Sequence, residues 1–287
     1  LRKNLAGRPG FRRRADSLMV RLNSESKTGN RLFFCANGTA ECEPLARELD
    51  GEVELWMLES GYGHIPGTQD AIEEISSRHL REILQIVGEG PIQLLGYSFA
   101  CLHATEIAAQ ATARGSLVTF LGWLDNRNCF TGVFGLYRHL EVRWENLKWS
   151  WLAARGKGTY LRRLGGIILR ALTRRLGLCR GESHPPPSAA VHRVLGPCRD
   201  PYRILPSRLP LHLFVACDHP LRNSLFPTLG WRRADYPLLR VWKSAGNHHT
   251  MGLSGNATTL ARVLRHALTV QPTALAACEA PQARALI

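Results

Sequence analysis

Residues 92–104, IQLLGYSFACLHA, join a short apolar run to an alanine-rich stretch through a turn of small residues. The apolar run stops at Gly96, which predicts a buried strand that ends there, and Leu102 to Ala113 predicts a helix. Between the two, Ser98 is flanked at two positions on either side by Gly96 and Ala100. A sharp strand-to-helix turn needs small residues at these places, because bulky side chains would collide with the strand and the helix. The stretch therefore predicts a serine held on a strained turn.

The alternation of strand and helix continues on both sides of this turn. Short apolar runs indicate further buried strands, at residues 31–36, 53–58, 117–124, 211–216 and 238–242. Helical spacing of apolar residues lies between them, at residues 44–49, 72–87 and about 258–268. Strands that alternate with helices in this way predict an α/β fold, with a mainly parallel central sheet and helices on both faces.

The rhythm breaks between about residues 127 and 206. Two stretches inside this segment, Leu140–Trp151 and Leu161–Leu172, have the apolar spacing of helices, and prolines interrupt the pattern after them. We expect these helices to form an insertion in a sheet domain that spans residues 17–270. Residues 1–16 are basic and contain Gly and Pro, which is typical of a linker or flexible arm, and 271–287 is expected to be a frayed tail.

A serine hydroxyl is a poor nucleophile near neutral pH, so it needs a neighbouring base that a carboxylate holds in the right tautomer. Asp125 follows the apolar run 117–124, and His248 lies in the loop after the run 238–242. Because the carboxyl ends of parallel strands meet at one edge of a sheet, Ser98, Asp125 and His248 can converge there. Two alternatives have similar positions. Asp218 follows the run 211–216 and is an alternative acid, and His249 is adjacent to His248.

Four stretches resemble the thioesterase domains that end nonribosomal peptide and polyketide synthetases: LLGYSFACLHATEIA, LGWLDN, GNHHTM and LFFCANGTAECEPLARELDG. The resemblance runs from about Ser17 to Leu268, except between residues 127 and 206, where that family has a variable lid. It implies an α/β-hydrolase fold with an inserted helical lid. It also implies a triad in which Ser98 is the nucleophile, His248 the general base and Asp125 the acid, and it favours these residues over Asp218 and His249. We expect the carboxylate of Asp125 to lie within hydrogen-bond reach of His248.

The turn after the first core strand departs from the family pattern. That family usually has His-Gly or a Pro-rich Gly-Gly sequence there, whereas this chain has Ala36, Asn37, Gly38 and Thr39. Backbone N–H groups can stabilise an oxyanion whatever their side chains. The expected donors are therefore the amide of Phe99, which follows the nucleophile, and that of Asn37 or Gly38.

The chain is strongly basic, with 37 Lys and Arg against 23 Asp and Glu, a net charge of +14 and a pI near 10.0. Many of the basic side chains lie in the segment 127–206. They can form a solvated face, a docking surface for an acidic carrier protein and the phosphate of its phosphopantetheine, or a basic amphipathic helix that contacts a membrane. No motif for nucleic-acid binding accompanies the charge, so we expect no nucleic-acid partner. No apolar run approaches the roughly 18 residues of a membrane span, so stable membrane insertion is not expected.

The eight cysteines are scattered, without the close pairs of zinc sites or redox motifs. This favours a reduced, cytoplasmic setting, and we expect no metal and no cofactor other than the phosphopantetheine that carries the substrate. The first residue is Leu rather than Met, which suggests a piece cut from a longer chain, or a processed chain. The resemblance implies an acyl or peptidyl carrier domain as partner, upstream in the same chain.

The sequence thus predicts a serine hydrolase that releases an acyl or peptidyl chain from a carrier-protein thioester through an acyl-Ser98 intermediate. Attack by water would give an acid, and attack by the chain's own amine or hydroxyl would give a ring. The alternatives are a stand-alone editing thioesterase, a lipase-like esterase and a non-catalytic binding module on the same fold.

Overall fold

The computed structural model describes residues 10–12, 16–36, 38–59, 71–128, 202 and 204–270. The chain divides into two compact units, and all described residues except Asn128 belong to the first. The second unit is Asn128–Arg193, of which only Asn128 is described. The expected lid helices between residues 140 and 172, the greater part of the expected insertion 127–206 and the tail 271–287 are outside them too.

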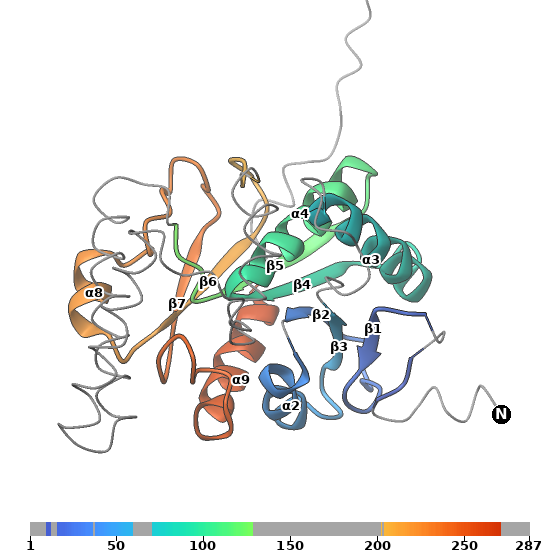
Figure 1. Cartoon of the computed structure of the whole chain (residues 1–287), viewed down its shortest axis with the longest axis horizontal. Helices are drawn as coiled ribbons and strands as arrows, with labels where there is room; N and C mark the ends of the chain where they lie inside the picture. The colour runs from blue at the N-terminus through green and yellow to red at the C-terminus, as the bar shows by residue number, and fades with distance from the viewer. Residues whose placement is uncertain are drawn as a thin grey trace, which may run out of the picture. The chain divides into compact units, whose positions relative to one another are not determined.

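Within the described ranges, a seven-stranded sheet has the order β1-β3-β2-β4-β5-β6-β7 (Figure 1). The edge strand β1 runs antiparallel to β3, and every other neighbouring pair is parallel. The strands are β1 (Met19–Arg21), β2 (Arg31–Ala36), β3 (Glu54–Glu59), β4 (Ile92–Tyr97), β5 (Val118–Leu124), β6 (Leu211–Ala216) and β7 (Arg240–Ser244).

Helices cover both faces of this sheet. Helices α3 (Ala71–Val87) and α4 (Cys101–Ala113) pack together on one face, and α2 (Thr39–Glu48) and α9 (Ser254–Thr269) pack together on the other (Figure 1). The short helix α8 (Pro220–Leu225), which the sequence did not predict, follows β6. A mainly parallel sheet with helices on both faces confirms the predicted fold class, the α/β-hydrolase fold.

The buried strands explain why the sequence reads as continuous apolar runs. Every residue of β6 is buried, and in β2 only the first residue is partly exposed. Strands covered by helices on both faces need apolar side chains at successive positions. Burial of each large aliphatic or aromatic side chain stabilises the fold by about 1.5–3 kcal/mol. The polar residues described below therefore lie at the ends of strands that are firmly packed in the core.

Strand β4 is longer than the apolar run predicted. It continues to Tyr97, because it pairs with strands on both sides: Gly96 is opposite Cys35 of β2, and Tyr97 is opposite Leu124 of β5. The backbone of Gly96 and Tyr97 thus forms part of the sheet, and the turn begins only at Ser98.

Part of the segment that the sequence assigned to a flexible arm contacts the sheet. Phe11 forms an isolated antiparallel bridge with Arg21 of β1, and the N–H of Gly10 donates to the Arg21 carbonyl. The guanidinium of Arg12 pairs with Glu59 at the end of β3. Residues 10–12 therefore lie along the antiparallel edge of the sheet.

Candidate active site

Ser98 begins the turn that the sequence singled out. Its φ of 54° lies in the left-handed region, which is strained for a residue with a side chain. The short 3₁₀ helix Ser98–Ala100 then leads directly into α4. A Cβ atom on Gly96 would lie 2.5 Å from the Cα of Cys101, so only glycine fits where the helix returns past the strand. Ala100 is buried in the same turn.

Asp125 lies beside this turn because strands β4 and β5 end at the same level. Leu124 pairs with Tyr97, so the residues that follow them, Asp125 and Ser98, leave the sheet side by side at its carboxyl edge. The N–H of Asp125 donates to the carbonyl of Phe214 at 2.8 Å. Its Oδ1 accepts the backbone N–H of Ala216 at 3.2 Å, and the residue is fully buried. The carboxylate is therefore held in one orientation by the neighbouring strand.

His248 is presented by a loop between β7 and α9. The loop turns at Gly246, whose φ is 87° and where a Cβ atom would lie 2.5 Å from the side-chain amide of Asn256. The N–H of Asn247 donates to the hydroxyl of Thr250 at 2.9 Å, and Asn256 donates to the Thr250 carbonyl at 3.0 Å. These contacts fix the backbone on both sides of the imidazole.

The three side chains form one continuous hydrogen-bonded chain. Ser98 Oγ is 3.0 Å from His248 Nε2, and His248 Nδ1 is 3.0 Å from Asp125 Oδ2, which lies in the expected range. A carboxylate accepts a hydrogen bond from Nδ1–H, which leaves Nε2 as the acceptor for the serine hydroxyl. The His248 side chain is 19% exposed, whereas Asp125 has no exposed area. This arrangement can remove a proton from Ser98 and stabilise the imidazolium that forms.

Part of the chain is similar in sequence to known proteins. Residues 33–139 match the family model described as thioesterase domain. This part of the chain is similar to the thioesterase domains of nonribosomal peptide synthetases. It is 38% identical over 95 residues to enterobactin synthase component F of Escherichia coli O157:H7, and 34% identical over 98 residues to vanchrobactin synthetase VabF of Vibrio anguillarum. Each match covers 32% of this chain, but only 7% and 4% of the respective relatives.

A solved structure extends the similarity over most of the fold. The crystal structure of the NocB thioesterase domain from the nocardicin cluster superposes with a TM-score of 0.60. It covers 88% of this chain and 98% of that chain, at 22% sequence identity. At this level of identity the similarity is one of fold.

The two alternative residues are exposed, and the ring centroid of His249 lies 5.1 Å from that of His248. Asp218 is exposed, and its backbone N–H donates to the Gly246 carbonyl at 3.0 Å. His249 is also exposed, and its backbone N–H donates to Asn247 Oδ1 at 2.9 Å. The carboxylate and imidazole that meet Ser98 are those of Asp125 and His248.

The expected oxyanion donors are only partly described. Phe99 follows Ser98 within the 3₁₀ turn, and Gly38 precedes α2 with an extended backbone at φ −174° and ψ 163°. Asn37 lies outside the described residues.

Two residues of this site were not found from the sequence. Arg127 is buried, and its Nε and Nη2 donate to Asp125 Oδ2 at 3.3 and 3.1 Å. The hydroxyl of Tyr97 donates to the backbone carbonyl of His248, and burial raises the pKa of this phenol well above its ordinary value. In the sequence, Arg127 is one of many basic residues at the start of a basic segment. Its pairing with Asp125 is apparent only from the structure of the turn after β5.

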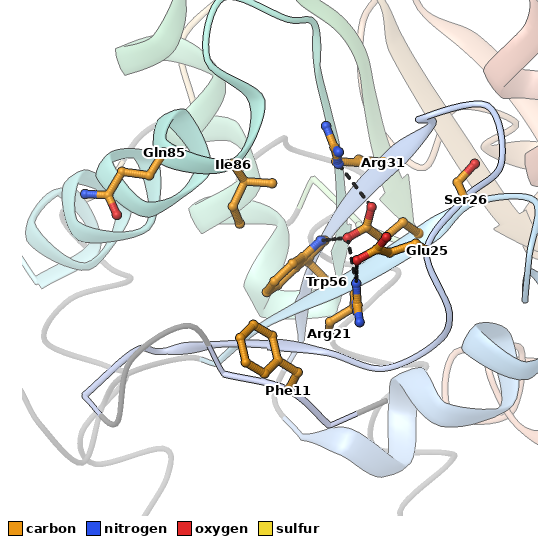
Figure 2. A pocket seen from close by; sticks show the side chains of 9 residues that line it. Phe11, Arg21, Glu25, Ser26, Arg31, Trp56, Gln85 and Ile86 are labelled. Carbon is orange, nitrogen blue, oxygen red and sulfur yellow. Dashed lines mark hydrogen bonds and ion pairs between the residues drawn. The ribbon is translucent and has the colours of Figure 1, made fainter. Parts of the chain in front are cut away.

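A second polar cluster lies at the opposite edge of the sheet, where β2 and β3 begin. It lines a hollow of about 360 Å³. Figure 2 shows its charged groups pairing with one another. Glu54 binds Arg31 at 3.0 Å and the indole N–H of Trp56 at 2.8 Å, and the buried Arg21 lies 3.6 Å from Glu54 and 2.8 Å from Glu25. The positive charges of Arg21 and Arg31 are thus balanced by the negative charges of Glu25 and Glu54. Because Arg21 belongs to β1 and Glu54 to β3, the cluster also links the antiparallel edge strand to the rest of the sheet.

Among the residues that the structure describes, no group of three or more His, Cys, Asp or Glu side chains is placed to hold a metal ion. Nor is any helix there long and apolar enough to cross a membrane.

Proposed function

We propose that this thioesterase domain uses Ser98 as a nucleophile to release an acyl or peptidyl chain from the phosphopantetheine thioester of a carrier protein. The observation that supports it most directly is the hydrogen-bonded chain from Ser98 through His248 to Asp125, at 3.0 Å for each step. The relatives found by sequence are synthetase components, which supports a substrate delivered on a carrier.

In the first step, Ser98 Oγ attacks the thioester carbonyl carbon while His248 Nε2 takes the hydroxyl proton. The carbonyl oxygen becomes an oxyanion that can accept hydrogen bonds from backbone N–H groups. The candidate donors are the amide of Phe99 and that of Asn37 or Gly38. The carbon–sulfur bond then breaks, the proton on His248 passes to the leaving thiolate, and the chain remains as an ester on Ser98.

In the second step, water or the chain's own amine or hydroxyl attacks the ester carbonyl. His248 takes the proton of the attacking group and returns it to Ser98 Oγ as the ester carbon–oxygen bond breaks. The product is an acid in the first case and a lactam or lactone in the second. No cofactor takes part, apart from the phosphopantetheine on which the substrate arrives.

The setting of the enzyme follows from the same proposal. A carrier domain would be the main partner, delivered from the same chain or from another. Cys35, Cys42, Cys101 and Cys217 are free thiols, which suits a reducing compartment such as the cytoplasm.

The proposal is tested by labelling folded protein with a fluorophosphonate and locating the adduct by mass spectrometry. We expect the adduct on Ser98, and no adduct in Ser98→Ala, which should fold like the parent because only one hydroxyl is removed. Ser116→Ala, at the opposite end of α4, is the matched control and should label normally. A parent protein that is folded but unlabelled would contradict the assignment of a nucleophile.

The carrier is tested by comparing turnover of a carrier-bound thioester with that of a small thioester mimic at low and high salt. Changing Arg162, Arg163, Arg174 and Arg175 to Gln should slow only the carrier substrate, and the difference should shrink as salt screens the contact. Equal effects on both substrates, or none, would favour a solvated basic face instead.

A further inference from the structure

The acid of the catalytic chain carries a second charged partner. Asp125 Oδ2, the same oxygen that faces His248 Nδ1 at 3.0 Å, also accepts Nε and Nη2 of Arg127 at 3.3 and 3.1 Å. The exposed fractions of the two side chains are 6% for Arg127 and 0% for Asp125. The interaction is therefore screened little by water, unlike an ion pair on the surface.

The backbone that carries Arg127 is also held in place. Between the two charged residues, the carbonyl of Asn126 accepts the indole N–H of Trp231 at 2.9 Å. Trp231 in turn packs against Trp123 of β5, with ring centroids 4.6 Å apart. The backbone from Asp125 to Arg127 is thus fixed to an aromatic cluster, and the guanidinium points back to the carboxylate.

A guanidinium keeps its charge throughout the working range of pH, so Arg127 acts on the triad in two ways. It orients the Asp125 carboxylate by two donors on one oxygen. It also places a positive charge beside the carboxylate that faces the imidazole. We propose that Arg127 is a positioning residue of the catalytic chain, which holds Oδ2 of Asp125 toward His248 and offsets part of the charge of that carboxylate.

This inference rests on the proposed function, because the protonation of His248 matters to turnover only if it is the base. The test therefore combines kinetics with an observation that needs no turnover. The imidazole of His248 is titrated by NMR in the parent, Arg127→Gln, Arg127→Lys and Arg114→Gln, and its signal is assigned with His248→Gln. Arg114 is exposed at the end of α4, so Arg114→Gln removes the same charge far from the site.

For Arg127→Gln we expect the titration midpoint of His248, and the acid limb of the profile of kcat/KM against pH, to move up by about one pH unit. We also expect kcat to fall about tenfold with KM unchanged, because the carboxylate loses two donors without any change in the substrate pocket. Arg127→Lys keeps the positive charge but not the two parallel donors of the guanidinium. Its titration midpoint for His248 should therefore stay near that of the parent, while its kcat should lie between those of Arg127→Gln and the parent. Arg114→Gln should match the parent in every measurement.

An unchanged midpoint and kcat in a folded Arg127→Gln variant would overturn the proposal. If that variant does not fold, Arg127→Lys decides: a lower kcat with unchanged KM supports positioning, and parental kcat overturns it. Failure of the proposed function has a different signature, since Ser98 would then resist the fluorophosphonate, whereas the NMR titration would still report the coupling between Arg127 and His248.

Discussion

Two regions of the protein contain histidines whose ring nitrogens meet different partners. At the carboxyl edge of the sheet, the two nitrogens of His248 face Ser98 and Asp125, and the ring keeps some exposure. Between α3 and α4, His79 Nε2 lies 2.8 Å from the carbonyl of Glu59, and His103 Nδ1 lies 3.4 Å from the Ser76 hydroxyl. Burial lowers the pKa of His79 to about 4 and that of His103 to about 3.

This difference shows that access and partners, rather than burial itself, decide what a histidine can do. A fully buried imidazole with a backbone carbonyl or a neutral hydroxyl as partner is fixed in its neutral form and contributes packing. An imidazole between a hydroxyl and a carboxylate at an accessible edge can move a proton. Substitution of each kind should therefore have opposite consequences for activity and stability.

The largest effect is expected for His248→Gln. Loss of the base should lower kcat on the order of 10⁶-fold, because a triad acts as a unit, while the free energy of unfolding changes little. The matched variant His79→Gln should do the reverse: it should lower the free energy of unfolding, and kcat per folded molecule should stay within about twofold of the parent. The measurements are turnover of a thioester substrate and urea unfolding. A His248 variant with near-parental kcat would remove the distinction between the two regions.

A smaller loss is expected for Asp125→Asn, because the amide can hold the wrong tautomer of His248 while the fold is kept. The expected decrease in kcat is about 10⁴-fold. Asp218→Asn is the control at the rival position, and its kcat should equal that of the parent, because its carboxylate is exposed. Loss of activity in the Asp218 variant together with retention in the Asp125 variant would reverse the assignment of the acid.

The sequence predicted that Ser98, Asp125 and His248 would meet because the strand ends are encoded locally. Apolar runs that stop at Gly96 and before Asp125 mark where strands leave the sheet, and parallel neighbours bring those ends to one edge. The small residues around Ser98 signal the turn in the same way, since the close approach of Cys101 to Gly96 is itself a local constraint.

What the sequence missed depends on contacts between distant segments. Tyr97 precedes Ser98, but its hydroxyl reaches a carbonyl 151 positions away. Arg127 is only two residues from Asp125, yet nothing in the sequence separates an arginine that folds back on a carboxylate from one that faces solvent. Residues 10–12 contact β1 through backbone pairing, which composition does not encode. The sequence therefore does not predict in which direction a side chain points at the end of a strand, or which segment pairs with an edge strand.

The smallest of the three effects concerns stability against pH, and it arises from the histidines between α3 and α4. Desolvation is the main cause of both lowered pKa values, with the charge of Arg78 acting on His79 and that of His79 on His103. Because the unfolded chain has histidines with a pKa near 6.5, it binds more protons than the folded protein below that pH. The contribution of these histidines to stability is thus complete above about pH 6.5. As pH falls it decreases by up to about 1.4 kcal/mol per pH unit for each histidine, and it levels off below the folded pKa values.

Urea unfolding of the parent between about pH 7.5 and 4.5 should therefore show a loss on the order of a few kcal/mol. In a variant with His79 and His103 both changed to Gln, stability should be lower at neutral pH, but it should fall less steeply on acidification. His249→Gln, which changes an exposed ring, should keep the parental slope. His212, whose pKa burial also lowers to about 4, is present in all three proteins, so its contribution cancels in the comparison. Equal slopes in the parent and the double variant would mean that the buried rings are protonated in the folded state, and the contrast with His248 would then rest on geometry alone.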